Sequence, residues 1–222
     1  MSLVILSDIH SNYRFLKKII NEIDLLKVED IYCLGDIIGY YDQPAECIDL
    51  LIERGVKCIK GNHEKYLLGE AHYNSKNESL YGFFKQKREL KDKQVEFLSL
   101  LPDQRIETIR NNRFIFIHSL PQNTTKYIFN PYKFDKTLLN KYDFYCSGHT
   151  HIPYILYINR TCVLNPGSVG QPRDYTKKPS FILIDLTKQS IILKKAKLDY
   201  ASYIKKLQKM NYSIKLMDIL KR

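Results

Sequence analysis

The sequence has no hydrophobic run long enough to cross a membrane. Its longest apolar stretches, such as residues 114–117, stop far short of the roughly 18 residues that a membrane-spanning helix needs. The opening segment, residues 2–8, has no basic start and reaches Asp8 too early for a signal peptide, so we expect a mature N-terminus. We therefore expect a cytoplasmic protein without a membrane partner.

Linkers, low-complexity tracts and internal repeats are absent as well. The chain has 222 residues, of which 44% are hydrophobic. Such a composition suits one compact domain, because single cores commonly reach about 250 residues before a chain divides. We therefore predict a single domain over residues 1–222.

Cysteines at the spacing of a disulfide framework or a zinc site are also missing. The five cysteines are odd in number and scattered, and no pair has Cys-x-x-Cys spacing: Cys33, Cys47, Cys58, Cys146 and Cys162. Four of them lie in apolar runs that are typical of buried elements. We expect reduced thiols in the core rather than disulfides or a structural zinc ion.

Acidic residues are scarce near the C-terminus. The whole chain carries a net charge of +11, from 35 Lys and Arg against 24 Asp and Glu. Residues 187–222 hold ten of the basic and two of the acidic residues, a net of +8, which leaves only +3 for the other 186 residues. Such a segment could bind nucleic acid or an anionic surface. We favour a solvated lysine face, because lysine without clusters of Arg or Gly is a weak indication of nucleic-acid binding.

The first half of the chain alternates short apolar runs with helical patterns. Residues 3–6, 31–34 and 56–59 are predicted strands. Residues 12–26 repeat apolar side chains at helical spacing, and a helix over residues 44–52 begins with Pro44, which suits a first helical turn. This order predicts parallel βαβ units. Residues 64–101 then favour a helical insert.

Short β-rich runs separated by turn residues dominate the second half. These predicted strands cover residues 105–108, 113–117, 142–146, 154–158, 161–164, 181–185 and 191–195. Asn-containing pairs at 111–112 and 159–160 stand at hairpin-like joints. A basic C-terminal helix is expected within residues 199–222, with Ser213 capping a final turn. The fold class that follows is α/β, with two packed mixed β-sheets flanked by helices.

Polar side chains follow five of the predicted strands, at the point where each strand ends. They are Asp8 and His10, Asp36, Asn62 and His63, His118, and His149 and His151. Asp8 and His10 are two positions apart, so a locally extended chain would aim both side chains the same way. Ligands of open α/β sheets gather outside the carboxyl ends of the strands, and nearby glycines allow tight turns there. We expect these side chains to form one site.

The residue types in these clusters indicate metal binding. Five of the six histidines in the chain lie in them, although a lone His after a strand is more often a structural residue. Imidazoles with carboxylates suit ions such as Zn²⁺, Fe²⁺ or Mn²⁺ rather than Mg²⁺ or Ca²⁺. Seven ligands exceed the need of one ion but suit two ions about 3.5–4 Å apart that share a carboxylate. Such a site favours an anionic substrate.

The motifs resemble those of the calcineurin-like metallophosphoesterase superfamily. The matching stretches, in order, are Ser7-Asp8-Ile9-His10-Ser11-Asn12, Leu34-Gly35-Asp36-Ile37-Ile38-Gly39-Tyr40, Lys60-Gly61-Asn62-His63-Glu64, Ile117-His118-Ser119 and Ser147-Gly148-His149-Thr150-His151-Ile152-Pro153. Residues 165–173 further resemble the signature of the small YfcE-like bacterial and archaeal phosphodiesterase branch. Ser11 and Ser119 depart from the family, which commonly has glycine there, but both are small enough for the turn. The resemblance implies an αββα sandwich.

The resemblance also implies a role for each polar residue. Asp8, His10 and His151 would bind one divalent ion, and Asn62, His118 and His149 would bind the other, with Asp36 as the bridge. The ions would be Mn, Fe, Zn, Ni or Co, with Mn favoured. A hydroxide held between them would attack phosphorus in line. His63 would donate a proton to the leaving oxygen, or else orient Asp8 or Asp36 as an outer partner.

Two further residues are candidates for substrate binding. Arg173 has the planar fork that suits phosphate, although its loop could merely pack beside the site. Asn12 could orient a ligand, but an Asn in that place more often caps a helix. The insert over residues 64–101 is expected near the active site, where it would limit substrate size.

The function expected from this resemblance is a metal-dependent phosphoric ester hydrolase acting on a phosphodiester or phosphomonoester. Its substrate would be a small phosphate ester or a nucleotide. The alternatives are a nuclease or RNA-processing enzyme that uses the basic C-terminus, and a non-catalytic protein-binding scaffold on the same fold, which predicts eroded ligands. Nucleic acid as a partner is not favoured, and a homo-oligomer stays open.

Overall fold

Two five-stranded sheets form the centre of the protein. The computed structural model describes residues 1–120, 126–198 and 200–221. The first sheet has the order β10-β9-β1-β2-β3, with β1 Ser2–Leu6, β2 Asp30–Cys33, β3 Lys57–Cys58, β9 Ser180–Asp185 and β10 Ser190–Lys195. The second has the order β4-β5-β6-β8-β7, with β4 Gln104–Ile109, β5 Asn112–Ile117, β6 Phe144–Ser147, β7 Tyr154–Ile158 and β8 Thr161–Asn165.

Both sheets combine parallel with antiparallel strands, and in the first sheet the antiparallel strands are β9 and β10. In the first sheet β1, β2 and β3 are parallel and are connected by α1 Tyr13–Asp24 and α2 Pro44–Glu53, which confirms the predicted βαβ units. In the second sheet β5, β6 and β8 are parallel, while β4 and β7 pair antiparallel. The parallel strands that precede the predicted ligands therefore deliver their carboxyl ends to a common region.

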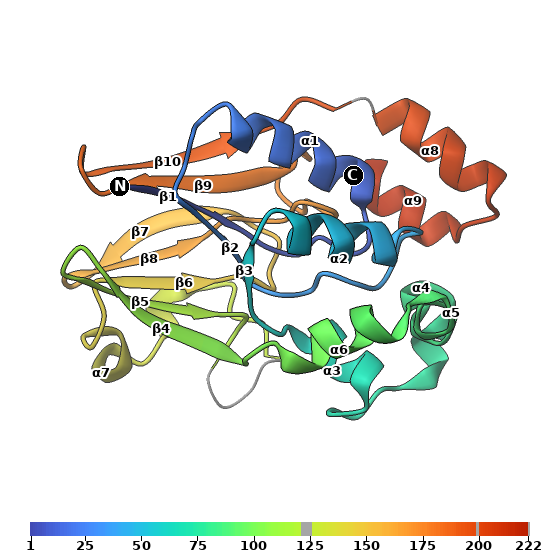
Figure 1. The fold of residues 1–222 in the computed structure, drawn as a ribbon, viewed down its shortest axis with the longest axis horizontal. Helices are drawn as coiled ribbons and strands as arrows, with labels where there is room; N and C mark the ends of the chain where they lie inside the picture. Colours follow the sequence, from blue (N-terminus) through green and yellow to red (C-terminus); the bar gives the residue numbers. More distant parts are fainter. Residues whose placement is uncertain (121–125, 199, 222) are drawn as a thin grey trace.

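Alternation along the strands creates three hydrophobic layers. Leu3 and Ile5 face the space between the sheets, where Tyr32 and Phe116 stack with ring centroids 4.0 Å apart. Their neighbours on β1 face outward and pack under α1 and α2. On the far side of the second sheet a third cluster includes Leu139 of α7 Lys136–Leu139. Figure 1 shows the two sheets with α1 and α2 over the first sheet and α7 beyond the second, which confirms the two packed mixed sheets flanked by helices.

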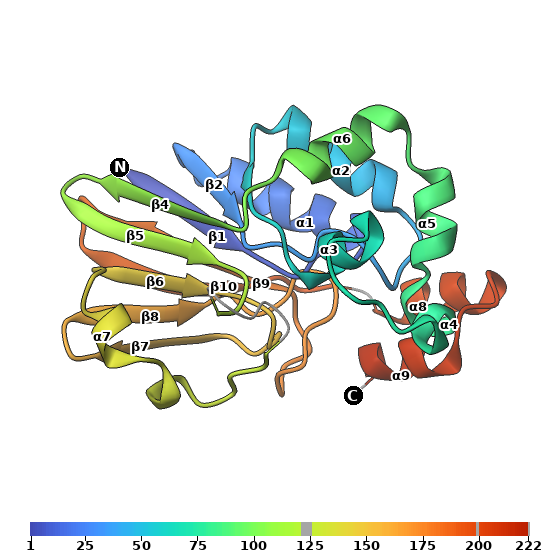
Figure 2. The ribbon, with the colours of Figure 1, turned by 90° about the horizontal axis from the view of Figure 1, so that it is seen from below.

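Helices gather at one end of the molecule. The insert is helical, as expected, with α3 Asn62–Leu68, η1 Ser75–Asn77, α4 Glu78–Tyr81, α5 Phe83–Glu89 and α6 Asp92–Leu100. After the short η2 Pro131–Lys133 and the last strands, the chain ends in α8 Tyr200–Lys209 and α9 Ile214–Lys221. Figure 2 shows α8 and α9 beside α4 and α5 at this end. The insert and these last helices add side chains to the cluster that α1 and α2 also share.

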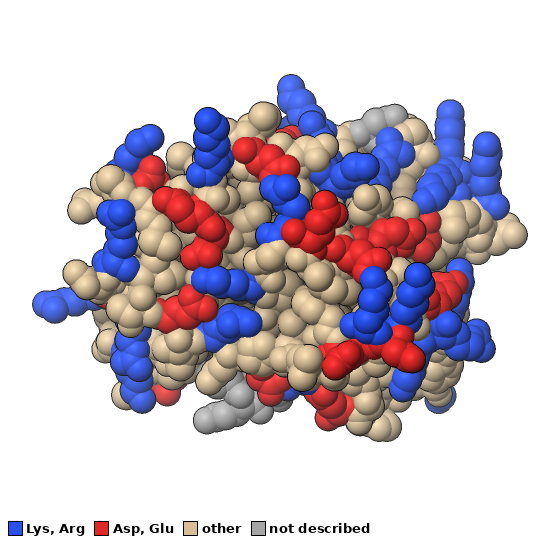
Figure 3. All heavy atoms as spheres, viewed as in Figure 1, with Lys and Arg blue, Asp and Glu red and all other residues tan. Residues whose placement is uncertain are grey.

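The C-terminal helices correct part of the expected solvated lysine face. Lys205 and Lys209 of α8 are exposed, as expected. Lys206 instead points to the loop after β2, where its Nζ lies 2.6 Å from Oδ2 of Asp42, because α8 packs directly on that loop. On the face shown in Figure 3, Lys and Arg side chains are interspersed with Asp and Glu, and basic side chains gather over α8.

Two other expectations concern the whole chain. All five cysteines are buried and free, as predicted. None of the helices in residues 1–120, 126–198 and 200–221 combines the length and the apolar character that a bilayer crossing requires.

Candidate metal centre

The loops after the strands turn through left-handed backbone. Asp8 has φ 55°, His10 φ 51° and Ser11 φ 57°, so the expectation that a locally extended chain aligns Asp8 and His10 is wrong. This loop instead folds onto the loop after β2, through hydrogen bonds from Asp8 N to Gly35 O and from His10 N to Asp36 O. Left-handed backbone costs roughly 1–2 kcal/mol per residue, and residues held in it cluster at functional sites.

The same conformation recurs at the other predicted ligands. Asp36 has φ 53°, His149 φ 68° and His151 φ 61°. Close approach requires glycine at two positions here: a Cβ at Gly61 would lie 2.2 Å from Oδ1 of Asp36, and one at Gly148 would lie 2.2 Å from Oγ of Ser7. The backbone is thus folded tightly around the polar side chains.

Asp8, His10 and His151 form one group of converging donor atoms. Nε2 of His151 lies 3.1 Å from Nε2 of His10 and 3.2 Å from Oδ1 of Asp8. Nε2 of His10 lies 3.8 Å from the same oxygen of Asp8. All three side chains are almost fully buried.

Asn62, His118 and His149 form a second group. Nε2 of His118 lies 3.1 Å from Oδ1 of Asn62 and 3.1 Å from Nδ1 of His149. Asp36 lies between the two groups, because its Oδ2 is 3.4 Å from Nε2 of His118 and 3.9 Å from Nε2 of His10. The structure therefore brings together all seven predicted ligands, with the Asp36 carboxylate at the position shared by both groups.

Three imidazoles are oriented by backbone carbonyls. Nδ1 of His118 lies 2.7 Å from Leu34 O, Nδ1 of His151 lies 2.7 Å from Gln171 O, and Nδ1 of His10 lies 3.2 Å from Ile38 O. A proton on each Nδ1 leaves the lone pair of each Nε2 directed at the centre. Such an outer hydrogen bond is usual for a histidine that binds a metal.

The donor set fits transition-metal ions. Oδ1 of Asp8 is buried and has no hydrogen-bond partner, and Nε2 atoms of His10 and His151 face each other at 3.1 Å. Ligand atoms about 2.0–2.2 Å from one ion are themselves separated by about 3 Å, so this spacing is that of neighbouring ligands. A cation would satisfy both the orphaned oxygen and the facing lone pairs.

The electrostatics of the site keep its carboxylates ionised. Burial alone would raise the pKa of Asp8 and of Asp36, but the imidazoles of His151 and His118 hold both below the usual range. Burial, with His63 and His151 nearby, also lowers the pKa of His10. Carboxylate and neutral imidazole are the forms that bind metal. Burial alone would lower the pKa of His118, but the Asp36 carboxylate raises it to about 9, so an ion bound by His118 would displace a proton.

His63 lies at the edge of this centre, inside an aromatic wall. Its backbone N donates to Oδ1 of Asp36 at 3.0 Å, and its Nδ1 lies 3.1 Å from Ile38 O. Its ring stacks on Tyr40 with centroids 5.0 Å apart and meets the edges of Tyr81 and Phe83. Nε2 of His63 is 3.8 Å from Oδ2 of Asp36. The insert thus supplies part of the wall around this imidazole.

Glu64 is a structural residue of the site that the sequence did not single out. Its buried carboxylate accepts hydrogen bonds from the backbone N of Asp36 at 2.9 Å, Ile37 at 2.8 Å, Ile38 at 3.3 Å and Gly61 at 2.7 Å. Burial and the charge of Asp36 raise its pKa to about 7. A Glu three residues after the first residue of a helix-capping turn was the available signal. Glu64 ties the loops after β2 and β3 together.

The loop over residues 165–173 packs on the loop of Asp8. Oγ of Ser168 donates to Asp8 O at 2.7 Å, and Gly170 N donates to the same oxygen at 2.9 Å. Gln171 supplies the carbonyl that orients His151. Arg173 is exposed, and its Nη2 donates to Oε1 of Gln171 at 2.8 Å. This loop therefore supports two ligands and presents one arginine.

Both the oxygen and the nitrogen of the Asn12 side-chain amide make hydrogen bonds. Its Oδ1 accepts from Phe15 N at 3.3 Å, which confirms the predicted cap of α1. Its Nδ2 donates to Gly170 O at 2.9 Å, so the residue also joins α1 to the loop over residues 165–173.

Comparison with known proteins agrees with the geometry. Residues 1–189 match the calcineurin-like phosphoesterase superfamily domain. An uncharacterised protein of Methanocaldococcus jannaschii is 32% identical over 203 residues, which cover 82% of each chain. The crystal structure of a metallophosphoesterase from Sphaerobacter thermophilus has a TM-score of 0.79 at 22% identity and covers 100% of this chain and 99% of that one. The phosphoesterase YfcE from E. coli has the same fold at a TM-score of 0.55 and 18% identity, over 89% of this chain and 100% of its own. The chain belongs to the calcineurin-like phosphoesterase superfamily.

Proposed function

We propose that this protein is a dinuclear metal-dependent phosphoesterase that hydrolyses a phosphodiester or phosphomonoester. The observation that carries the proposal is the pair of buried donor groups that share the Asp36 carboxylate. Asp8, His10 and His151 would hold one ion, and Asn62, His118 and His149 the other. The ions would supply a nucleophile at neutral pH and offset charge on the phosphoryl group.

His63 and Arg173 would act directly on the substrate. As an imidazolium that donates its Nδ1–H to Ile38 O, His63 would give its Nε2 proton to the leaving oxygen and return to the neutral imidazole. Its fixed ring needs no reorientation during the step. The exposed guanidinium of Arg173 would contact phosphate oxygens, and Glu64 would hold Asp36 in place through the backbone.

The donor set also bears on the other functions. A non-catalytic scaffold has no need of seven converging, buried donors, and all seven are present here. We propose one domain over residues 1–222, with manganese as the favoured ion and a small phosphate ester or nucleotide as the substrate. The ion pair of Lys206 with Asp42 removes one lysine from the basic segment that a nuclease would use.

Metal analysis and ester hydrolysis test the proposal together. Protein reconstituted with Mn²⁺ should contain about two ions per chain, the number that a shared carboxylate implies, and should hydrolyse bis-p-nitrophenyl phosphate or p-nitrophenyl phosphate. His118→Ala should lose metal and activity. His72→Ala is the matched control, because His72 is exposed and lies outside both groups, and it should keep both. Protein that binds no metal and shows no metal-dependent thermal shift would contradict the dinuclear centre.

A further inference from the structure

Two exposed aromatic side chains continue outward from one of the candidate metal ligands. The ring of Tyr127 lies over the imidazole of His149, with centroids 3.9 Å apart and planes inclined by 22°. Phe129 stacks on Tyr127 at 5.5 Å with an interplanar angle of 4°. Tyr127 is 44% exposed and Phe129 is 63% exposed. An aromatic surface therefore begins at the metal centre and opens to solvent.

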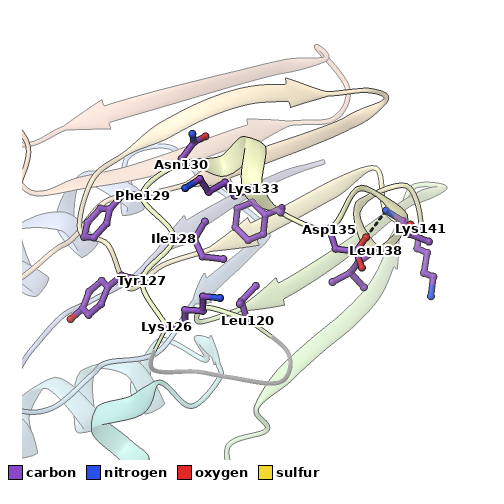
Figure 4. Close-up of a pocket in the computed structure, with 12 residues that line it drawn as sticks. Leu120, Lys126, Tyr127, Ile128, Phe129, Asn130, Lys133, Asp135, Leu138 and Lys141 are labelled. Atoms are coloured by element: carbon purple, nitrogen blue, oxygen red, sulfur yellow. Dashed lines mark hydrogen bonds between the residues drawn. The ribbon is translucent and has the colours of Figure 1, made fainter.

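The segment that carries these rings is anchored from behind. Ile128, between them, packs against the hydrophobic cluster on the far side of the second sheet. Figure 4 shows Ile128 on one side of the segment and Tyr127 and Phe129 on the other, which is the alternation of an extended chain. Oγ of Ser119, next to the ligand His118, donates to Lys126 O. The two rings are thus held in place before any ligand arrives.

The positively charged side chain of Arg173 lies beside the same aromatic surface. The side chain of Arg173 is hydrogen-bonded to the side chain of Tyr127. The backbone N of Arg173 donates to His151 O at 3.3 Å, so this arginine is also fixed next to a ligand of the other group. An anionic group near the metals and a planar group on the rings could therefore be held at once.

A purely structural role accounts for Tyr127 but not for Phe129. A cover over His149 needs only the ring that touches it, whereas Phe129 stacks on the outer ring and leaves most of its own surface in water. Behind the segment lies a cavity of about 780 Å³, lined in part by Lys126, Lys133 and Lys141. Asp135 is the acidic residue of the same lining, so the surroundings of the segment are open and carry a net positive charge.

We propose that Tyr127 and Phe129 form a stacking subsite for the base of a nucleotide substrate whose phosphate lies at the metal centre beside Arg173. This inference rests on the proposed phosphoesterase function and names its substrate class. Aromatic side chains bind bases of any sequence, because every base has a planar π-face, and phosphate suits the arginine fork.

Adenosine 5′-monophosphate and ribose 5-phosphate separate the base from the rest of the ligand. Calorimetric titration of the Mn²⁺-loaded protein should give tighter binding of adenosine 5′-monophosphate, by about 5- to 100-fold, which is the usual range for one base stacked on aromatic side chains. Phe129→Ala and Tyr127→Ala should bring this ratio several-fold closer to one. Tyr127→Phe, which keeps the ring, should retain it. Tyr157→Ala is the matched control, because Tyr157 is a similarly exposed aromatic residue on β7, and its ratio should equal that of the wild type.

The outcomes distinguish this inference from the proposed function. Equal affinity of the wild type for both ligands, or a ratio unchanged in both alanine variants, overturns the stacking subsite while ester hydrolysis stands. Because Phe129 is mostly exposed and touches no candidate ligand in the described contacts, its variant should fold even if Tyr127→Ala does not. If metal-loaded protein hydrolyses no ester and binds neither ligand, the phosphoesterase function itself is wrong.

Discussion

The two sides of the candidate metal centre are built differently. On the side of His63 the rings of Tyr40 and Phe83 are buried. His63 itself is held by hydrogen bonds of its backbone N and of its ring Nδ1. On the side of His149 the rings of Tyr127 and Phe129 are about half exposed. A closed side suits a group that must act from one position, whereas an open side suits the variable part of a ligand.

The difference follows from the chain segments that form each side. The closed side comes from the loop after β2 and from the helical insert, which pack into the largest hydrophobic cluster. The open side comes from residues 126–133, which hold no regular element longer than the three residues of η2. Rigid elements thus position the proposed chemistry, and a loop carries the proposed selectivity.

The Asp36 carboxylate lies between the two groups of proposed ligands, so Asp36→Asn should have the largest effect on metal binding and activity. Its carboxylate lies near donor atoms of both groups, and an amide cannot offset the charge of two ions. We expect loss of bound metal and a fall in kcat/KM of about 10⁴-fold, because the ions would supply several kcal/mol of charge stabilisation. Asn62→Ala, which removes one neutral ligand, should cost less. Near-normal turnover of Asp36→Asn with both metals bound would show that Asp36 is not shared.

His63→Asn tests the closed side alone. If His63 donates a proton, its loss should lower kcat by about 10²–10⁴-fold on an alkyl or nucleoside ester. The fall should be much smaller on a nitrophenyl ester, because the nitrophenolate leaving group departs with little help from an acid. Both metals should remain bound. Rates on the two substrates at saturating Mn²⁺ provide the measurement. An equal loss on both, together with weaker metal binding, would instead make His63 an outer partner of Asp36.

Glu64→Gln, on the same side of the metal centre, should lower metal affinity or activity by less than the two substitutions above lower activity. The amide can no longer accept all four backbone hydrogen bonds, so the loop of Asp36 should lose its fixed position. Loss of an outer partner typically costs about 10- to 100-fold in metal affinity or activity. Titration with Mn²⁺ should show the weaker affinity, and Glu53→Gln, at an exposed site on α2, should not. Unchanged Mn²⁺ affinity would show that Glu64 stabilises the fold without positioning Asp36 for metal binding.

The sequence predicted where the strands lie along the chain and which polar side chains meet at the strand ends. Periodicity locates β1, β2 and β5, and the residue types that follow them are enough to bring seven donors into one region. Spacing alone failed at Asp8 and His10. The backbone there is left-handed because the loop is held by hydrogen bonds to the loop after β2, which are partners far away in the sequence.

The remaining features depend on tertiary contacts that no local pattern encodes. Glu64 has the sequence of an ordinary helix start, yet it accepts from residues 26–28 positions earlier. Tyr127 lies in an irregular segment, and only the folded chain shows that its ring covers His149. The ion pair of Lys206 with Asp42 joins residues 164 positions apart.

Substitutions of the lysines of α8 should have the smallest effects on activity. Such a result would confirm that both sides of the metal centre act without this helix. Lys206→Ala removes the cation beside the nearly buried carboxylate of Asp42, which keeps the hydrogen bond from the Tyr203 hydroxyl, and should cost about 1 kcal/mol of stability, or about 2–4 °C in Tm. Lys205→Ala and Lys209→Ala, at exposed positions of the same helix, should stay within about 0.5 kcal/mol of the wild type. Thermal unfolding of the three variants makes this measurement. Hydrolysis of a small ester should stay within a few-fold in all three, and a large loss that appears only at low salt would assign substrate binding to this helix instead.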